Sequence, residues 1–460
     1  MKKTIKIIFS FLACFIVSIM TFYGCAQPLL TAPTVTAEMV TTGDALAYEE
    51  YIYFANAFKS FSSLTKNDND IGNVINEALY RVKLVDNKIE YDEETNMPEN
   101  VELVLSKVLG SDHTFLFSIN DYIYFASPNS RKDMSSADKF ELTTYFRVKT
   151  DGTNLSEIYT TETEVSNQTI LKVENKNYLI FQDGTSVVKI ELGNSIGRAE
   201  TIATEIKNVV FAKTVAEEND KYIYYTTDIS DELINLGQTG TYIYKLDITT
   251  GISTLMNETG YSNKTITPVS VVNGNLHFTM NDSDSLTYYY SYSSGAFSTA
   301  VKISNPIDNI TVNNFLSLKS NSNDRTYYIF SVSTDNVNKT YCLQSGSKDF
   351  SESNLLVGSA IEILFAYNDY VYYAVENEGI YRISVLDKVV QTVALCESFK
   401  TTNIGFDGKY VYFYKTSEVN STGTYYMHRA DVRNAERGND GIIELVGFLD
   451  EQDMPEETEE

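Results

Sequence analysis

The sequence predicts an all-β fold, a single β-propeller of about eight four-stranded blades, and three features of its 460 residues predict it. A tyrosine-rich alternating strand recurs along the chain, turn-forming residue pairs precede most copies, and two further strands follow most copies. No long segment keeps a helical period, so helices are not expected to build the core.

The recurring strand has the form Tyr-apolar-Tyr-aromatic. Its copies are Tyr51–Phe54, Tyr122–Phe125, Tyr178–Phe181, Tyr222–Tyr225, Tyr370–Tyr373 and Tyr410–Phe413, and weaker copies stand at Asn275–Phe278 and Tyr327–Phe330. The mean spacing from the first copy to the last is about 51 residues, near the roughly 40 to 50 residues of a propeller blade. Seven blades is the alternative, if the weak fifth or sixth unit is not a blade.

Turns and connections frame each copy. The turn pairs before the copies are Asn120-Asp121, Asn175-Lys176, Asn273-Gly274, Asn368-Asp369 and Asp407-Gly408. Asn, Asp and Gly tolerate the positive φ that two-residue hairpin turns require. A polar connection then leads to a third strand such as Leu79–Leu84, and a second turn to a fourth strand such as Val390–Leu395. Four strands per unit is the pattern of a propeller blade. Either Pro33–Val40 or Ile442–Leu449 is expected to supply the last outer strand.

The first residues predict export. Lys2, Lys3 and Lys6 precede an apolar run, residues 7–23, which ends at Gly24-Cys25. A cysteine after a small residue at this point predicts cleavage and lipidation at Cys25, as in bacterial lipoproteins. Phe22 and Tyr23 depart from the residues commonest before such a cysteine. An ordinary cleaved signal and an uncleaved anchor are the alternatives, although the apolar run is short for the roughly 20 residues of a span.

The expected domains follow from these boundaries. Residues 1–24 are a lipoprotein signal peptide, residues 25–36 a lipidated tether, residues 37–449 the propeller, and residues 450–460 an acidic disordered tail. The expected location is the extracytoplasmic face of the cell membrane, with the Cys25 lipid as the anchor.

Charge excludes one class of partner. The net charge is −26, and loss of residues 1–24, which hold three lysines and no acid, takes it to −29. Such a chain does not bind a phosphate backbone by charge, so no nucleic-acid partner is expected. Anionic lipid is excluded as an electrostatic partner for the same reason.

Residues able to carry chemistry are few. Cys342 and Cys396 stand in successive repeats, and two buried free thiols are favoured over a disulfide. The three histidines, His113, His277 and His428, lack metal-ligand spacing. Two acidic stretches, 67–72 and 281–285, lack the distal glutamate of a calcium loop, so they are interpreted as solvated turns. No catalytic residue, metal ligand or cofactor is therefore predicted.

One repeat resembles a known family. Ile223–Asp228 followed by Tyr244–Asp247 is similar to the YWTD-type propeller repeat of low-density-lipoprotein-receptor-like proteins, and Leu79–Asp86, Phe146–Gly152 and Ile380–Asp387 match its second half. Bacterial domain families of unknown function carry similar repeats. The chain has no tryptophan, and only Asp228 matches the motif aspartate in its full setting. The resemblance implies a structural role for Asp228, joining blades, and implies protein or peptide binding rather than catalysis.

A membrane-tethered scaffold that binds a protein, peptide or glycan is the favoured function. The longest insertions, Ala57–Ala78, Ser127–Thr144 and Ile229–Thr241, all follow a second strand, so they are expected on one face of the disc, which is then the interaction surface. The alternative is an envelope hydrolase or lyase with a site in the propeller pore. An inert structural subunit of an envelope complex is a third reading. Fold alone does not separate these functions.

Overall fold

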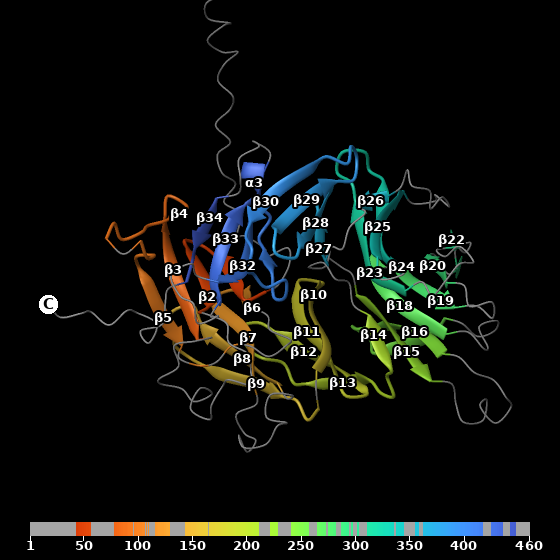
Figure 1. The fold of residues 1–460 in the computed structure, drawn as a ribbon. Helices are drawn as coiled ribbons and strands as arrows, with labels where there is room; N and C mark the ends of the chain where they lie inside the picture. The colour runs from red at the N-terminus through yellow and green to blue at the C-terminus, as the bar shows by residue number, and fades with distance from the viewer. Residues whose placement is uncertain are drawn as a thin grey trace, which may run out of the picture. The chain divides into compact units, whose positions relative to one another are not determined.

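The computed structural model describes residues 43–56, 78–94, 96–105, 107, 109, 116–128, 143–163, 165–210, 221–228, 241–256, 265–272, 275–281, 287–293, 296–297, 301–302, 311–334, 337–344, 355–357, 362–416, 425–435 and 442–447. These residues form antiparallel sheets, numbered here in chain order, and each sheet is made of strands that follow one another in the sequence. The fold is an all-β propeller (Figure 1).

The first four sheets span residues 45–255. Sheet 1 holds β1 (Ala45–Tyr48), β2 (Tyr51–Ala55), β3 (Leu79–Val85), β4 (Lys88–Ile89) and β5 (Val101–Leu105), and sheet 2 holds β6 (Leu116–Ile119), β7 (Tyr122–Pro128), β8 (Thr143–Lys149) and β9 (Ser156–Thr160). Sheet 3 holds β10 (Val165–Val173), β11 (Lys176–Asp183), β12 (Ser186–Leu192) and β13 (Glu200–Ala203). Sheet 4 holds β14 (Asn208–Val210), β15 (Tyr222–Asp228), β16 (Thr241–Asp247) and β17 (Ile252–Leu255).

The remaining sheets span residues 265–445. Sheet 5 holds β18 (Thr265–Val272), β19 (Asn275–Asn281), β20 (Thr287–Ser293), β21 (Ala296–Phe297) and β22 (Val301–Lys302), and sheet 6 holds β23 (Thr311–Lys319), β24 (Thr326–Thr334), β25 (Val337–Gln344) and β26 (Leu355–Val357). Sheet 7 holds β27 (Glu362–Tyr367), β28 (Tyr370–Val375), β29 (Gly379–Ser384) and β30 (Val390–Leu395). Sheet 8 holds β31 (Gly405–Phe406), β32 (Tyr410–Thr416), β33 (Tyr425–Asp431) and β34 (Ile443–Leu445), with the short helix α3 (Val432–Ala435) after β33.

The number of blades is where the structure departs from the favoured expectation. The favoured count of eight blades is not supported, and the seven-blade alternative is. The weakest copy of the repeat, Asn275–Phe278, lies in sheet 5, and Asn275 and His277 replace the two tyrosines of the stronger copies.

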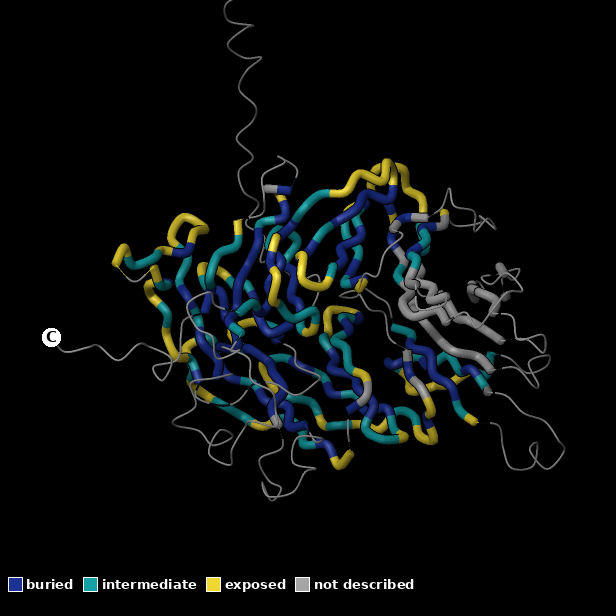
Figure 2. The backbone as a smooth tube through the Cα atoms, viewed as in Figure 1, coloured by how far each residue is buried: buried dark blue, intermediate teal, exposed yellow. Residues whose placement is uncertain are grey.

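The tyrosine-rich strand is buried on both faces because it lies between two neighbouring sheets. In β2, Ile52, Tyr53 and Phe54 are all fully buried. The Tyr53 hydroxyl reaches sheet 2, whereas Phe54 lies on the side of sheet 8, beside Gly447. Alternation along the strand therefore directs Tyr51 and Tyr53 to the following sheet, and Ile52 and Phe54 to the preceding one. In Figure 2 the buried residues follow the strands, and the exposed ones gather in the turns.

Each predicted hairpin turn that the structure describes has at least one residue with a positive φ, and Asn368-Asp369 has it at both positions. Asn120, Asn175, Asn368, Asp369 and Gly408 all have φ between 44° and 86°. The turn between β10 and β11 of sheet 3 is formed by Glu174 and Asn175, one residue earlier than the predicted pair Asn175-Lys176. Glu174 also has a positive φ, and Lys176 already begins β11. The predicted pair Asn273-Gly274 lies outside the described residues.

The last outer strand comes from the C-terminal candidate. β34 pairs with β33, with Ile443 opposite Ala430 and Leu445 opposite His428. Pro33–Val40 lies outside the described residues, as do the predicted signal, tether and acidic tail. Within the part of the chain that the structure describes, no helix has the length and apolar character needed to cross a bilayer.

Candidate functional site

A basic residue on the third strand stacks on the first tyrosine of the second strand in six sheets. The cation lies 3.7 to 5.5 Å from the ring centroid in the pairs Arg81/Tyr51, Arg147/Tyr122, Lys189/Tyr178, Lys245/Tyr222, Arg382/Tyr370 and Arg429/Tyr410. A cation over the face of a tyrosine is attracted by the negative charge density of the ring. The first tyrosine of the repeat is therefore a platform for a cation.

The fourth strand supplies a polar partner on the other side of the cation. Carboxylates accept from the basic group in three sheets, where Arg81 binds Glu102, Lys189 binds Glu200 and Arg429 binds Glu444 at 2.6 to 3.0 Å. Neutral oxygens take this place elsewhere, as Arg147 Nε donates to Ser156 Oγ and Arg382 Nε donates to Gln391 Oε1. The cation is thus fixed in position between two strands of its own sheet.

The fixed cation then reaches the next sheet. Arg81 Nη1 donates to the carbonyl of Thr150 in sheet 2 at 2.9 Å, and Arg147 Nη1 donates to that of Gly193 after β12 at 2.6 Å. Lys189 Nζ donates to the carbonyl of Ile248 after β16 at 3.0 Å. Each acceptor lies in the turn between the third and fourth strands of the following sheet. We call this arrangement the inter-sheet tie.

The second tyrosine of the repeat strengthens two of these ties. Tyr53 Oη donates to the same Thr150 carbonyl at 3.2 Å, and Tyr124 Oη donates to that of Gly193 at 3.0 Å. Burial raises the pKa of both tyrosines, although the neighbouring arginine opposes the rise. Both hydroxyls are therefore neutral donors that hold backbone, and they are not nucleophiles or general bases.

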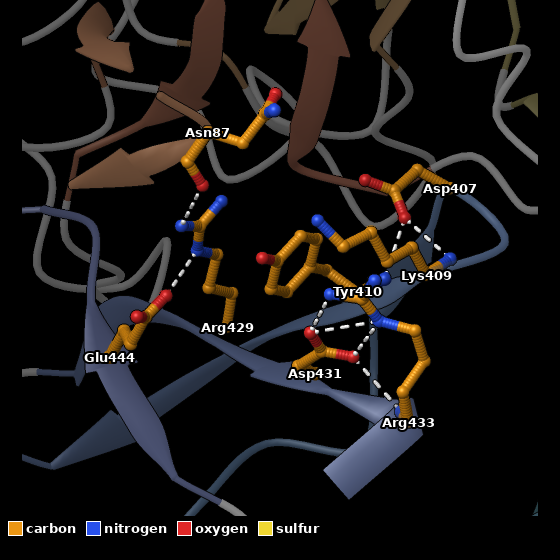
Figure 3. A network of polar contacts seen from close by, with 8 residues as sticks. All are labelled: Asn87, Asp407, Lys409, Tyr410, Arg429, Asp431, Arg433 and Glu444. Carbon is orange, nitrogen blue, oxygen red and sulfur yellow. Dashed lines mark hydrogen bonds and ion pairs between the residues drawn. The ribbon is translucent and has the colours of Figure 1, made fainter. Parts of the chain in front are cut away.

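The same tie joins the last sheet to the first. Figure 3 shows Arg429 between Glu444 and Asn87, with the Tyr410 ring beside it. Arg429 Nε donates to Glu444 Oε2 at 2.6 Å, and Arg429 Nη2 donates to the Asn87 carbonyl at 3.4 Å. The Arg429 side chain is 1% exposed. Burial opposes its charge, but Tyr412, Glu444 and Tyr410 more than compensate and raise its pKa. A second ion pair in the same view, Arg433 with Asp431, is exposed on its arginine side.

The ties also show which ends of the sheets lie together. Each tie ends in a third-to-fourth strand turn of its neighbour, and first-to-second strand turns meet there too, as Tyr48 Oη donates to the carbonyl of Asn120 and Asn321 Nδ2 donates to Asn368 Oδ1. We call these grouped ends the turn end. The opposite ends, the loop end, meet where the Leu116 amide donates to the Gly43 carbonyl.

The three long insertions leave from the loop end. Ala55 pairs with Leu79, Pro128 with Thr143, and Asp228 with Thr241, and in each hairpin the turn end is the far end of the same two strands. This register supports the expectation that the insertions emerge on one face. The insertions themselves, apart from the strand residues at their ends, lie outside the described residues.

The predicted site residues fall in different places. Cys25, His113 and residues 67–72 lie outside the described residues, as do residues 282–285 of the second acidic stretch, whereas Asn281 is the last residue of β19. Asp228 ends β15, and its carboxylate lies 2.6 Å from Lys207 Nζ, which precedes β14 of the same sheet. This contact joins two strands of one sheet, and a role for Asp228 between blades stays a prediction.

Cys342, Cys396 and His428 are buried, and His277 lies in β19, where it pairs with Ser270 and Ser291. Cys342 and Cys396 are free thiols, as predicted, and burial raises the pKa of each to about 12. Burial lowers the pKa of His428 to about 4, while its Nδ1 lies 2.8 Å from the Tyr426 carbonyl. Among the residues that the structure describes, no group of three His, Cys, Asp or Glu side chains is placed to hold a metal ion.

Sequence reasoning missed the inter-sheet ties. The signal was present, because an arginine recurs in the third strands at Arg81, Arg147, Arg382 and Arg429. What the sequence alone does not give is the acceptor, a backbone carbonyl that lies 46 to 69 residues away or at the other end of the chain.

Comparison with known proteins finds similarity among solved structures alone. No protein-family model matches the chain, and no curated protein matches it by sequence. Among solved structures it is similar to a puromycin hydrolase mutant complexed with PGG (7% identity, TM-score 0.45, 73% of this chain and 54% of that one) and to an oligogalacturonate lyase in complex with manganese (10% identity, TM-score 0.45, 68% and 86%). It is also similar to the Dos1 propeller (10% identity, TM-score 0.46, 84% and 93%). The chain thus spans about half of the hydrolase, and its structural neighbours include hydrolase and lyase propellers.

Proposed function

We propose that this chain is an exported, lipid-anchored propeller that binds a protein, peptide or glycan through the loop end of its sheets. The observation that carries the proposal is the register of the second and third strands, from which the insertions Ala57–Ala78, Ser127–Thr144 and Ile229–Thr241 leave in one direction. Recognition is commonly carried by loops that a rigid frame holds in place.

The turn end supports this assignment by contrast. Its connections at residues 150–155, 193–199 and 248–251 are short, and backbone carbonyls in them accept hydrogen bonds from the neighbouring sheet at Thr150, Gly193 and Ile248. Groups engaged in holding the sheets together are not free to bind a ligand without breaking the frame. The turn end therefore holds the sheets together, and the loop end is available for recognition.

The chemistry of the described residues favours binding over catalysis. The tyrosine hydroxyls and arginines of the ties are hydrogen-bonded to backbone, and the buried thiols have raised pKa values. A nucleophile or general base needs a pKa suited to its task and access to substrate. A net charge of −26 also argues against a nucleic-acid ligand.

Membrane attachment in this proposal comes from the lipid on Cys25, which follows the apolar run of residues 7–23. Cys25→Ser should abolish incorporation of a labelled fatty acid and move the protein from the membrane fraction to the soluble exported fraction. The lipid anchor is overturned if the variant still incorporates the labelled fatty acid. It is also overturned if the wild-type protein stays in the membrane fraction without incorporating the fatty acid, and that result favours an uncleaved helix as the anchor.

The binding function is tested by affinity capture. The tagged chain is isolated from the envelope of its parent cell, and bound proteins and glycans are identified by mass spectrometry. We expect one component to be enriched reproducibly, and its amount to fall when residues 57–77 are replaced by a short glycine–serine linker. Full retention of that component after all three insertions are shortened overturns the proposal. An envelope hydrolase or lyase predicts instead that polysaccharide or peptide substrates are cleaved.

A further inference from the structure

The interface between sheet 8 and sheet 1, here called the seam, closes without an exchanged strand. Every strand of sheet 8 comes from residues 405–445, and every strand of sheet 1 comes from residues 45–105. In the described part of the chain, neither sheet takes a strand from the opposite end of the sequence. The seam therefore depends on side-chain contacts and on hydrogen bonds outside the sheet ladders.

Near the loop end the seam is held by a few polar contacts. The Asp44 amide donates to the Asn403 carbonyl at 3.3 Å, and Asn403 Nδ2 donates to Asp44 Oδ2 at 3.1 Å. Tyr414 Oη donates to the carbonyl of Ala55 at 3.2 Å in a buried setting. Tyr412, Tyr414 and Met427 of sheet 8 belong to the same hydrophobic cluster as the core of sheet 1.

An extended connection of sheet 1 reaches the outer part of sheet 8. Residues 86–100, here called the latch, join β3 to β5 and include β4. Tyr91 Oη in the latch donates to the carbonyl of Leu445 in β34 at 3.0 Å. Met97 and Leu445 both pack against Tyr426, which is fully buried. Burial and Glu444 raise the pKa of Tyr91, so its hydroxyl stays a neutral donor.

The latch is a folded hairpin with its own hydrogen bonds. Tyr91 pairs with Pro98, and the Asp92 amide donates to the Met97 carbonyl at 2.9 Å. The Glu99 amide donates to the Glu90 carbonyl at 2.7 Å. These bonds hold Tyr91 and Met97 in position, so less conformational entropy is lost when they pack on sheet 8.

Third-to-fourth strand connections in other sheets are shorter. Residues 150–155, 193–199, 248–251 and 385–389 serve this purpose in sheets 2, 3, 4 and 7. The turns of sheets 2, 3 and 4 receive a tie from the preceding sheet at Thr150, Gly193 and Ile248. The latch receives the Arg429 tie at Asn87 and also returns contacts to β33 and β34. The extra length of the latch is used at the seam, where no exchanged strand is present.

We propose that the latch closes the propeller ring, and that the seam is the interface that opens first when the latch is loosened. Local opening takes place where fewest contacts must be broken. Without the latch, the outer half of the seam loses the Tyr91 hydrogen bond, the Met97 packing and the Asn87 acceptor of the Arg429 tie. The latch thereby sets how often sheet 8 separates from sheet 1 under native conditions.

Native-state hydrogen–deuterium exchange of the full chain tests this inference. In Tyr91→Phe/Met97→Ala, we expect protection of the β33 and β34 amides to fall by about tenfold, the effect of one lost hydrogen bond with its packing. Amides of β11 and β12 in sheet 3 should keep their protection. A second variant, in which Glu90–Glu99 is replaced by Asn-Gly, should give a larger loss in the same strands.

Tyr48→Phe is the matched control, because it removes a tyrosine-to-carbonyl hydrogen bond between sheets 1 and 2, at Asn120. It should leave β33 and β34 protected. Equal loss of protection in all sheets means that the latch supports global stability only, and unchanged protection in both latch variants means that it holds nothing. Either result overturns the proposal.

Discussion

Replacing Arg429 with methionine should destabilise the propeller far more than the same change at Arg433, four residues along the chain. Methionine keeps an unbranched apolar side chain but removes the guanidinium. Arg429 loses its contacts to Glu444, to the Asn87 carbonyl and to the Tyr410 ring, which lies 4.1 Å from its Cζ. Arg433 loses its ion pair with Asp431 and a contact with the Tyr410 hydroxyl.

The magnitude follows from these contacts. A hydrogen bond to a charged group contributes about 1.5 to 3 kcal/mol, and a desolvated cation on a tyrosine face contributes on the order of 1 to 2 kcal/mol. The 3.4 Å bond to Asn87 adds little, and Glu444 is 30% exposed, so water partly compensates its lost partner. We therefore expect a loss of about 3 kcal/mol of unfolding free energy for Arg429→Met.

Arg433 provides the control because its guanidinium is 57% exposed. Exposed ion pairs contribute about 0 to 1 kcal/mol, so Arg433→Met should cost less than 1 kcal/mol. Both variants are measured by urea unfolding of the purified protein, followed by tyrosine fluorescence and far-ultraviolet circular dichroism. Equal losses for the two variants, or a loss below about 1 kcal/mol at Arg429, refute the view that buried basic residues hold the sheets together.

Three further predictions concern buried groups. The pKa of His428 is about 4 in the folded state against 6.5 when exposed, so the unfolded state binds a proton first as pH falls. The free energy of unfolding should therefore be unaffected by His428 above pH 6.5 and should drop by about 3 kcal/mol by pH 4. His428→Phe should flatten this part of the stability–pH curve. Cys342 and Cys396, with pKa values of about 12, should react with a thiol reagent at pH 8 at least about tenfold more slowly than in 8 M urea, and equal rates contradict their burial. Gly379 has φ 143°, and a Cβ there meets the Ala394 carbonyl, so Gly379→Ala should cost about 2 kcal/mol or more in urea unfolding, and an unchanged midpoint contradicts the strain.

Much of the fold could be predicted from the sequence because its signals are local. Alternation gives the second strands, and the predicted fourth strand Val390–Leu395 has the same bounds as β30. Asn120, Asn368 and Gly408 mark their turns because few residues accept a positive φ. The blade count was less secure where the repeat loses its tyrosines, around Asn275.

The contacts between sheets were not predictable in the same way. The tie of Arg429 to Asn87 spans nearly the whole chain, and nothing in either neighbourhood specifies the other. The latch was also missed, because Tyr91 and Met97 lie in a polar stretch without a strand pattern. The contacts of Tyr91 with Leu445 and of Met97 with Tyr426 depend on the closure of the ring, which is a property of the assembled sheets.

The central claim, that recognition belongs to the loop end, is tested most directly by comparing capture of the enriched envelope component with two variants. One replaces residues 57–77 by a short linker at the loop end. The other replaces the exposed residues Leu386, Val389 and Val390, at the turn between β29 and β30, with serine. Both proteins should fold, and only the loop-end variant should lose at least about tenfold in affinity, about 1.4 kcal/mol. Loss of binding in the turn-end variant, with full binding in the other, contradicts the account.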